Sequence, residues 1–129
     1  MKKLNFTMAL LLIITLLFTA CGKKAKPIEL PTADSISSIE IPGGIEDIIV
    51  TDKELISSFI EKVQEAKPTS KQSVHDLPTV PEYIRVDFVG DNIFKSIFVY
   101  QENSKWYIEQ AYIGIYETDG DLLKILIGE

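Results

Sequence analysis

Polar and apolar side chains alternate along two neighbouring segments that follow residue 36. Residues 37–41 read Ser-Ser-Ile-Glu-Ile, Pro-Gly-Gly at 42–44 turns the chain, and residues 45–50 run back as a second apolar-rich segment. An alternating segment, a turn and a returning segment are typical of a β-hairpin. We therefore predict a hairpin over residues 37–50.

The pattern changes to a helical spacing after residue 51. Glu54 stands three residues after Thr51, which is the spacing of a capping box, and Pro68 follows the last apolar position. Apolar side chains recur on one helical face in between, at Leu55, Ile56, Phe59, Ile60 and Val63. The spacing predicts a helix over residues 52–66.

The C-terminal half predicts three strands and a short helix. Residues 82–89, 93–101 and 106–117 are rich in strand-forming side chains and are separated by short polar connections, which suit an antiparallel meander. Thr118, followed by apolar side chains at 122, 123, 125 and 126, predicts the short helix over residues 118–126. The expected order is β-β-α-β-β-β-α, a single small α+β domain whose antiparallel meander packs against helices. A loop of about 14 residues, 68–81, contains three prolines and is longer than most connections in compact domains.

The N-terminal segment has the pattern of an export signal. Two lysines near the start precede the apolar residues 8–18, and small residues stand at 19 and 20 before Cys21. A transmembrane helix is the alternative, but the apolar stretch of about 13 residues is shorter than the roughly 20 that a span needs. A buried core cysteine is the alternative for Cys21, and its neighbours Gly22, Lys23 and Lys24 disfavour it.

Residues 17–21, Leu-Phe-Thr-Ala-Cys, resemble the lipobox of bacterial lipoproteins. The resemblance implies that Cys21 receives a diacylglyceryl group and that the chain is cut just before it, although Phe18 replaces the smaller aliphatic residue usual at that position. Two acyl chains anchor a protein stably. We expect a lipoprotein signal peptide at 1–20, a lipidated tether at 21–27 and one extracytoplasmic domain at 28–129, held at the outer face of the cell membrane.

Charge is distributed unevenly along the chain, which has 129 residues and a net charge of −6. After residue 27 there are 8 basic and 19 acidic residues, a net charge of −11. This balance argues against nucleic acid and against the domain itself lying on an anionic bilayer, and it favours a basic protein or cationic peptide as partner. Lys23, Lys24 and Lys26 either strengthen membrane attachment or form a solvated tether.

Candidate chemistry is sparse. One cysteine and one histidine exclude an internal disulfide and a multi-histidine metal site. Ser73, His75 and Asp76 are residue types of a hydrolytic triad, but neighbours in one loop seldom converge, and Asp76 suits a turn. We expect no catalytic residue, no metal site and no cofactor apart from the lipid on Cys21, while His75 and Asp76 remain candidates for ligand binding.

Aromatic residues concentrate near the C-terminus. Of the ten aromatics after residue 20, nine lie between Tyr83 and Tyr116. Most are expected in the core, but tyrosine-rich surfaces also form binding patches, so Tyr107, Tyr112 and Tyr116 are candidates, with Glu109 as a polar anchor. Because side chains alternate along a strand, Tyr107 and Glu109 share a face, which we expect to be outward and accessible to a partner.

Three segments resemble an uncharacterised family of small lipoproteins from Gram-positive bacteria: residues 28–31, 73–78 and 106–116. Similar modules occur at the extracytoplasmic end of BlaR-type membrane metallopeptidases. The last segment is the most specific, and it departs from the family pattern at Ala111, where a proline is usual. The resemblance implies a location and a fold, and no reaction.

Three functional hypotheses follow. The leading one is a non-enzymatic, membrane-anchored module that binds a protein, a peptide or a component of the cell envelope. The second is an immunity or inhibitor lipoprotein that neutralises a cationic toxin or bacteriocin, because the domain is acidic and the tether is short. The third is a small envelope hydrolase centred on residues 68–81.

Overall fold

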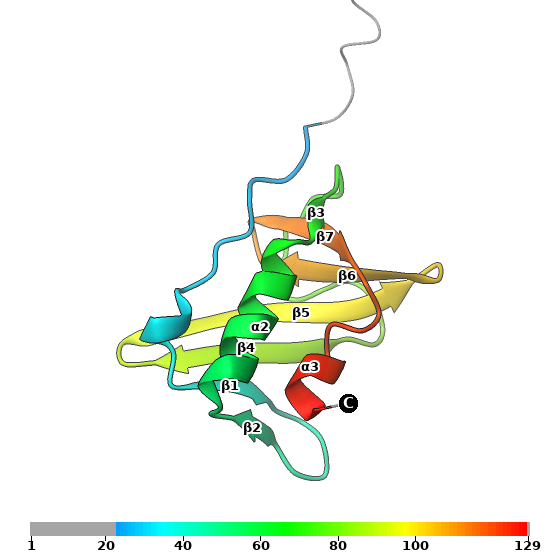
Figure 1. Cartoon of the computed structure of the whole chain (residues 1–129). Helices are drawn as coiled ribbons and strands as arrows, with labels where there is room; N and C mark the ends of the chain where they lie inside the picture. Colours follow the sequence, from blue (N-terminus) through cyan, green and yellow to red (C-terminus); the bar gives the residue numbers. More distant parts are fainter. Residues whose placement is uncertain (1–22, 129) are drawn as a thin grey trace, which may run out of the picture.

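The computed structural model describes residues 23–128, which form a small domain with a seven-stranded antiparallel sheet and two short helices (Figure 1). The expected signal peptide and Cys21 lie outside the described residues. The strands are β1 (Ser38–Ile41), β2 (Ile48–Val50), β3 (Lys67–Pro68), β4 (Ile84–Gly90), β5 (Ile93–Glu102), β6 (Lys105–Gln110) and β7 (Gly114–Thr118). The helices are α2 (Lys53–Gln64) and α3 (Lys124–Ile127), preceded by the 3₁₀ turn η1 (Ala33–Ser35).

The strand order across the sheet is β2-β1-β4-β5-β6-β7-β3. The predicted hairpin is present as β1 and β2, with Ile39 opposite Val50. The predicted strand pairing of the meander is present from β4 to β6, with Val86 opposite Ile97 and Tyr100 opposite Tyr107. The coarser part of the predicted fold is confirmed: the domain is small and has an antiparallel sheet and two short helices, with strands as its main component.

The predicted strand over residues 106–117 is wrong, because the chain turns in its middle. β6 ends at Gln110, the amide of Ile113 donates to the Gln110 carbonyl at 3.0 Å, and β7 returns antiparallel to β6. Tyr112 takes a left-handed backbone conformation in this turn, with φ of 62°. An aromatic residue seldom adopts that conformation, so nothing in the local residue types signals the turn.

The predicted helix is present as α2, but its cap differs from the expected one. The Asp52 carboxylate accepts the amides of Glu54 and Leu55 at 2.9 and 3.0 Å, so Asp52, and not Thr51, is the N-cap. The C-terminal helix also begins later than expected, at Lys124, after a turn over residues 119–123. Among the described residues, no helix is long and apolar enough to cross a membrane.

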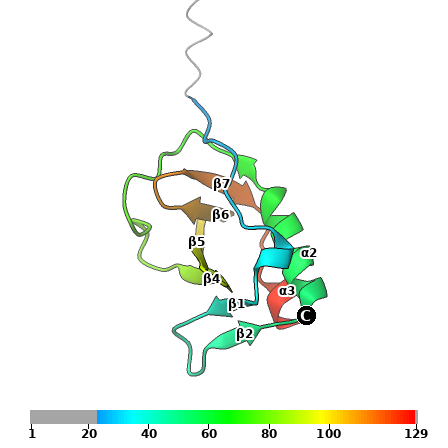
Figure 2. The same ribbon diagram turned by 90° about the vertical axis from the view of Figure 1, so that its left-hand side faces the viewer.

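The main hydrophobic core lies between the helices and one face of the sheet. Figure 2 shows α2 and α3 on one side of the sheet and the loop between β3 and β4 on the other. The core residues of α2 are Ile56, Phe59, Ile60 and Val63, and they pack in one cluster with sheet residues such as Val86, Phe88, Ile97, Val99, Ile108 and Tyr116. This face sets the register of every long strand, because a slip of one residue would expose all of these side chains.

A second, smaller cluster lies on the opposite face of the sheet. It contains Tyr100, Tyr107 and Ile115, and Val80 from the loop packs against it. The loop of residues 69–83 therefore covers this part of the face, while Phe94, nearer the start of β5, is exposed. The covered region is where polar side chains meet.

Candidate functional site

Glu109 on β6 is the centre of a buried polar cluster beneath the loop of residues 69–83. Its side chain accepts a hydrogen bond from the Ser73 hydroxyl at 2.7 Å and another from the Tyr100 hydroxyl at 3.2 Å. Glu109 is only 5% exposed. A carboxylate offers about four acceptor positions, so two hydroxyl donors leave part of its capacity free.

Ser73 connects the loop to the sheet in two directions. Its hydroxyl donates to Glu109, and the same oxygen accepts the backbone amide of Tyr112 at 3.3 Å. One side chain thus joins the loop to β6 and to the β6–β7 turn. Ser73 is buried, whereas its loop neighbours Gln72 and Val74 are exposed.

A cavity of about 280 Å³ lies between this loop and the sheet. The sheet contributes Tyr100, Glu102, Glu109 and Ile115 to its lining, and the loop contributes Lys71, Gln72, Val74, His75, Thr79 and Val80. The sheet side of the cavity therefore carries two carboxylates and an aromatic ring. Both kinds of group bind cations in proteins. The cavity is therefore the candidate functional site.

Lys71 shows how a cation is held at this site. Its ammonium lies 2.8 Å from a carboxylate oxygen of Glu102 and 4.3 Å from the centre of the Tyr107 ring. The hydrogen bond to Glu102 raises the pKa of Lys71 above its usual value, and the partial desolvation of the ammonium opposes this rise. The pair combines an ion pair with a cation–π contact.

Tyr100 stays a neutral donor to Glu109. Burial is the main cause that raises the pKa of Tyr100 above its usual value, and the negative charge of Glu109 adds to it. Both causes disfavour a second negative charge in a region shielded from water. The phenol therefore keeps its proton and can stabilise the Glu109 carboxylate.

Tyr107 and Glu109 share a face as predicted, but the expectation that this face is outward is wrong. Tyr107 is 7% exposed and Glu109 is 5% exposed, because the loop of residues 69–83 folds over them. The alternation along β6 determines which side chains share a face, while a segment distant in sequence determines whether that face is covered.

The other candidate residues are spread over three locations. Tyr116 is 1% exposed and lies in the helix-side core, opposite Ile108. Tyr112 is 65% exposed in the β6–β7 turn, and a hydrogen bond with Asp76 raises its pKa. His75 is exposed and lines the cavity. The structure thus brings Tyr107 and Glu109 close to the cavity, with His75 on its lining, and places Tyr116 elsewhere.

The residue types of a triad in the loop do not converge. The Ser73 hydroxyl donates its hydrogen bond to Glu109, and in residues 23–128 no hydrogen bond joins Ser73 to His75 or Asp76. The same part of the chain contains no group of three or more His, Cys, Asp or Glu residues that could hold a metal ion.

Lys71 and Tyr100 belong to the site although the sequence did not point to them. Tyr100 lies directly opposite Tyr107 in the β5–β6 pairing. A meander with the correct register would have placed these two tyrosines side by side. Lys71 and Ser73 reach the site only through the path of the long loop, which no periodic pattern describes.

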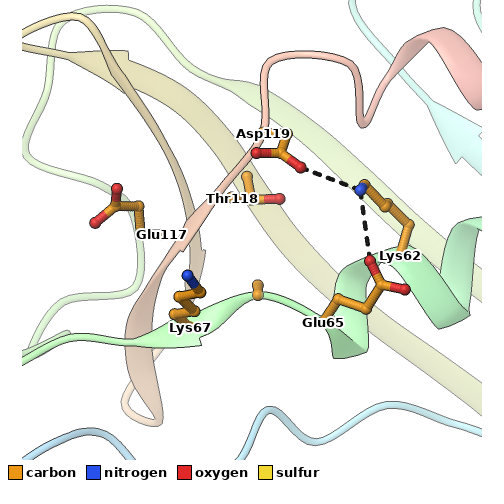
Figure 3. Close-up of a pocket in the computed structure, with 7 residues that line it drawn as sticks. Lys62, Glu65, Lys67, Glu117, Thr118 and Asp119 are labelled. Carbon is orange, nitrogen blue, oxygen red and sulfur yellow. Dashed lines mark hydrogen bonds and ion pairs between the residues drawn. The ribbon is translucent and has the colours of Figure 1, made fainter.

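A second cleft, of about 240 Å³, lies between the end of α2 and the β3–β7 edge (Figure 3). Lys62 contacts both Glu65, at 3.4 Å, and Asp119, at 3.1 Å. The two carboxylates share this one ammonium, and both are largely exposed to solvent. Among the residues that line this cleft none is buried, so we place the site at the cavity beneath the loop, where Glu109 is buried.

The fold and the cavity define a small antiparallel-sheet domain with a loop-covered polar site. The family model DUF5301, described as a domain of unknown function (DUF5300), matches residues 24–117. The chain belongs to this family. No curated protein is significantly similar to it.

One solved structure is clearly similar. It is the NMR structure of a protein from Ruminococcus gnavus, with 33% sequence identity and a TM-score of 0.64. The match covers 74% of this chain and 97% of that chain. The shared fold therefore accounts for nearly the whole of that chain.

Proposed function

We propose that this protein is a lipid-anchored, non-enzymatic binding module of the cell envelope, and that its loop-covered cavity receives a cationic group of a protein or peptide partner. Glu109 is the observation that carries the proposal. It is a buried carboxylate on the cavity wall, and its two hydrogen-bond partners are neutral hydroxyls.

The charge of Glu109 is the reason for expecting a cation. Buried carboxylates are usually paired with a positive group, because desolvation of an isolated charge is costly. Within residues 23–128, no lysine, arginine or histidine nitrogen lies within 4.0 Å of the Glu109 carboxylate. An ammonium or guanidinium group that entered the cavity would complete the missing pair.

Lys71 shows that this region binds a cation, and its own ammonium would compete with a cationic ligand. Its ammonium already contacts the Tyr107 ring and the Glu102 carboxylate, at the edge of the site. A cationic ligand would meet this internal cation before it reached Glu109. Removal of the Lys71 charge should therefore strengthen ligand binding, whereas removal of the Glu109 charge should weaken it.

The location of the module follows from the lipobox at residues 17–21, and membership of a lipoprotein family from Gram-positive bacteria is part of the proposal. Binding at the outer face of the membrane would place the cavity where basic segments of membrane and secreted proteins are found. A cationic toxin or bacteriocin is one such partner, so an inhibitor or immunity role is a second candidate that uses the same site.

Isothermal titration with short lysine-rich and arginine-rich peptides tests the site, with acidic peptides of equal length as negative controls. Glu109→Gln keeps the shape of the side chain but removes its charge. Because hydrogen bonds to charged groups contribute about 1.5–3 kcal/mol, affinity for the basic peptides should fall by roughly tenfold or more. Lys71→Met should change affinity in the opposite direction.

Glu117→Gln is the matched control. Glu117 lies on the neighbouring strand β7, outside the cavity lining, and its removal changes the net charge equally. Its affinity should stay close to that of the unmodified protein. Equal losses for Glu109→Gln and Glu117→Gln would show that binding depends only on net charge. The proposal that the cavity binds the peptide would then be wrong.

A further inference from the structure

We infer that the end of the domain next to the tether is a membrane-facing surface, which rests on an anionic bilayer and fixes the orientation of the domain. The surface consists of Lys23, Lys24 and Lys26 together with Val74 and Tyr112. The inference takes its setting from the proposed lipid anchor, but the affinity of this surface for a bilayer is a separate property of residues 23–128.

The expected tether is held against the domain and is not a free linker. The Ala25 amide donates to the Thr69 carbonyl at 3.0 Å, and the Tyr116 hydroxyl donates to the Lys26 carbonyl. Gly114 lies directly beneath Ala25, and a β-carbon at Gly114 would collide with the Ala25 side chain. Ala25 and Lys26 therefore pack against the domain, although the expected tether contains them.

This docking leaves very little free chain near the anchor. Only four residue steps separate Cys21 from Ala25, which corresponds to about 14 Å at full extension. The backbone contacts of Ala25 and Lys26 place the tether lysines beside the β3–β7 edge, while β2 forms the opposite edge. Figure 1 shows the chain leaving the domain at this end.

The cleft at this end is lined by basic and neutral residues alone. Its volume is about 300 Å³, and Lys23, Lys24, Lys26 and Lys71 contribute to its wall. Lys71 is neutralised by Glu102, so the positive field comes mainly from the three tether lysines. Residues of this cleft also contact three carboxylates: Lys71 contacts Glu102, Ser73 contacts Glu109, and Tyr112 contacts Asp76. The side formed by Lys23, Lys24 and Lys26 is therefore the part suited to face an anionic surface.

Nonpolar side chains project beside these lysines. Val74 is 58% exposed and Tyr112 is 65% exposed, and both line the same cleft. Tyrosine is enriched at the level of lipid headgroups, where its ring is apolar and its hydroxyl meets water. The combination of lysines with an exposed aromatic ring and an aliphatic side chain favours a bilayer over a purely polar polyanion.

Sedimentation with lipid vesicles tests the inference, using an unlipidated chain that begins after Cys21. This form isolates the surface from the anchor and keeps all the residues that the structure describes. It should bind phosphatidylglycerol-containing vesicles and not pure phosphatidylcholine vesicles. Since each lysine near an anionic bilayer contributes a factor of about five, the triple variant Lys23→Gln/Lys24→Gln/Lys26→Gln should bind about 100-fold more weakly.

The triple variant Lys95→Gln/Lys105→Gln/Lys124→Gln is the matched control, because it removes the same charge from β5, β6 and α3. Its vesicle binding should fall far less. Equal losses in both triple variants, or no binding of the unmodified chain to anionic vesicles, would overturn the inference. Neither result would bear on lipidation of Cys21, which is absent from this form.

A fluorescent variant distinguishes a bilayer from other polyanions. Tyr112→Trp should shift its emission to shorter wavelength with anionic vesicles, relative to the background of Trp106 in the unmodified chain. A soluble anionic polymer should produce no such shift. If the polymer bound as tightly as the vesicles and the emission stayed unshifted in both, the surface would be a polyanion site and the inference would be wrong.

Discussion

Ser73 connects three parts of the molecule through one hydroxyl group. It donates to the Glu109 carboxylate, accepts the Tyr112 amide, and belongs to the loop that covers the cavity. A single oxygen with one donor and two acceptor positions suits this double role. The closed position of the loop over the site therefore depends on Ser73 more than on its exposed neighbours.

Ser73→Ala should destabilise the domain and loosen the loop. Loss of a buried hydrogen bond to a charged acceptor, together with an unpaired amide at Tyr112, should lower the free energy of unfolding by about 1–3 kcal/mol. Urea unfolding measures this change, and amide hydrogen exchange of residues 72–80 measures the opening of the loop. Ser70→Ala, at an exposed position of the same loop, should change stability by less than about 0.5 kcal/mol.

Tyr100 should make stability fall as the solution becomes strongly alkaline. Its pKa is raised in the folded state, so above the ordinary tyrosine value of about 10 the folded state binds more protons than the unfolded state. The free energy of unfolding then decreases as pH rises through that range. The decrease should be less steep in Tyr100→Phe, measured by urea unfolding at a series of pH values, and an unchanged slope would show that Tyr100 titrates normally.

Helix α2 is stabilised by its N-cap in addition to its buried apolar face. Asp52 accepts two backbone amides, whereas Thr51 precedes the cap. Asp52→Ala should lower the free energy of unfolding by about 1 kcal/mol, because the first turn loses its side-chain acceptor. Thr51→Ala should have a much smaller effect. A larger loss for Thr51→Ala than for Asp52→Ala, measured by thermal or urea unfolding, would contradict this assignment.

At the level of elements, local patterns predicted what local interactions determine. The hairpin, α2, β4 and β5 follow from periods of two and 3.6 residues and are present near their expected bounds, whereas β6 ends at Gln110, inside the predicted strand 106–117. β3 has two residues, which is too short to display a period. The β6–β7 turn has Tyr112 where glycine or asparagine would be expected, so its residue types do not signal a turn.

The candidate site was only partly predictable for a related reason. Alternation placed Tyr107 and Glu109 on one face, and the length of the loop indicated a possible function. The contact between that loop and that face joins residues separated by 36 positions, as in the Ser73–Glu109 hydrogen bond. Neither the burial of Glu109 nor the position of Lys71 on the Tyr107 ring can be derived from periodicity.

For the whole molecule, the tether and the cavity lie near the same end of the domain. Lys71, Gln72 and Val74 line both the cavity beneath the loop and the cleft beside the tether lysines. A bilayer at the tether end would therefore bring a ligand at the membrane surface close to the cavity. The acidic remainder of the domain would face away from the membrane.

Cys21→Ala tests the anchor on which this arrangement depends. In cells, the variant should lose labelling by radioactive fatty acid, and the protein should be released to the medium or remain unprocessed. Both results follow from the loss of the thiol that would carry the diacylglyceryl group. Continued lipid labelling of the variant would show that the attachment site lies elsewhere.

The most direct test of the central claim, that the cavity binds a cationic group of a partner, is cross-linking in intact cells followed by mass spectrometry. The unmodified, tagged protein should capture one stoichiometric partner through a lysine-rich or arginine-rich segment. Glu109→Gln should lose this partner, and Glu117→Gln should retain it. Equal capture by both variants, or a cross-linked segment without basic residues, would contradict the account.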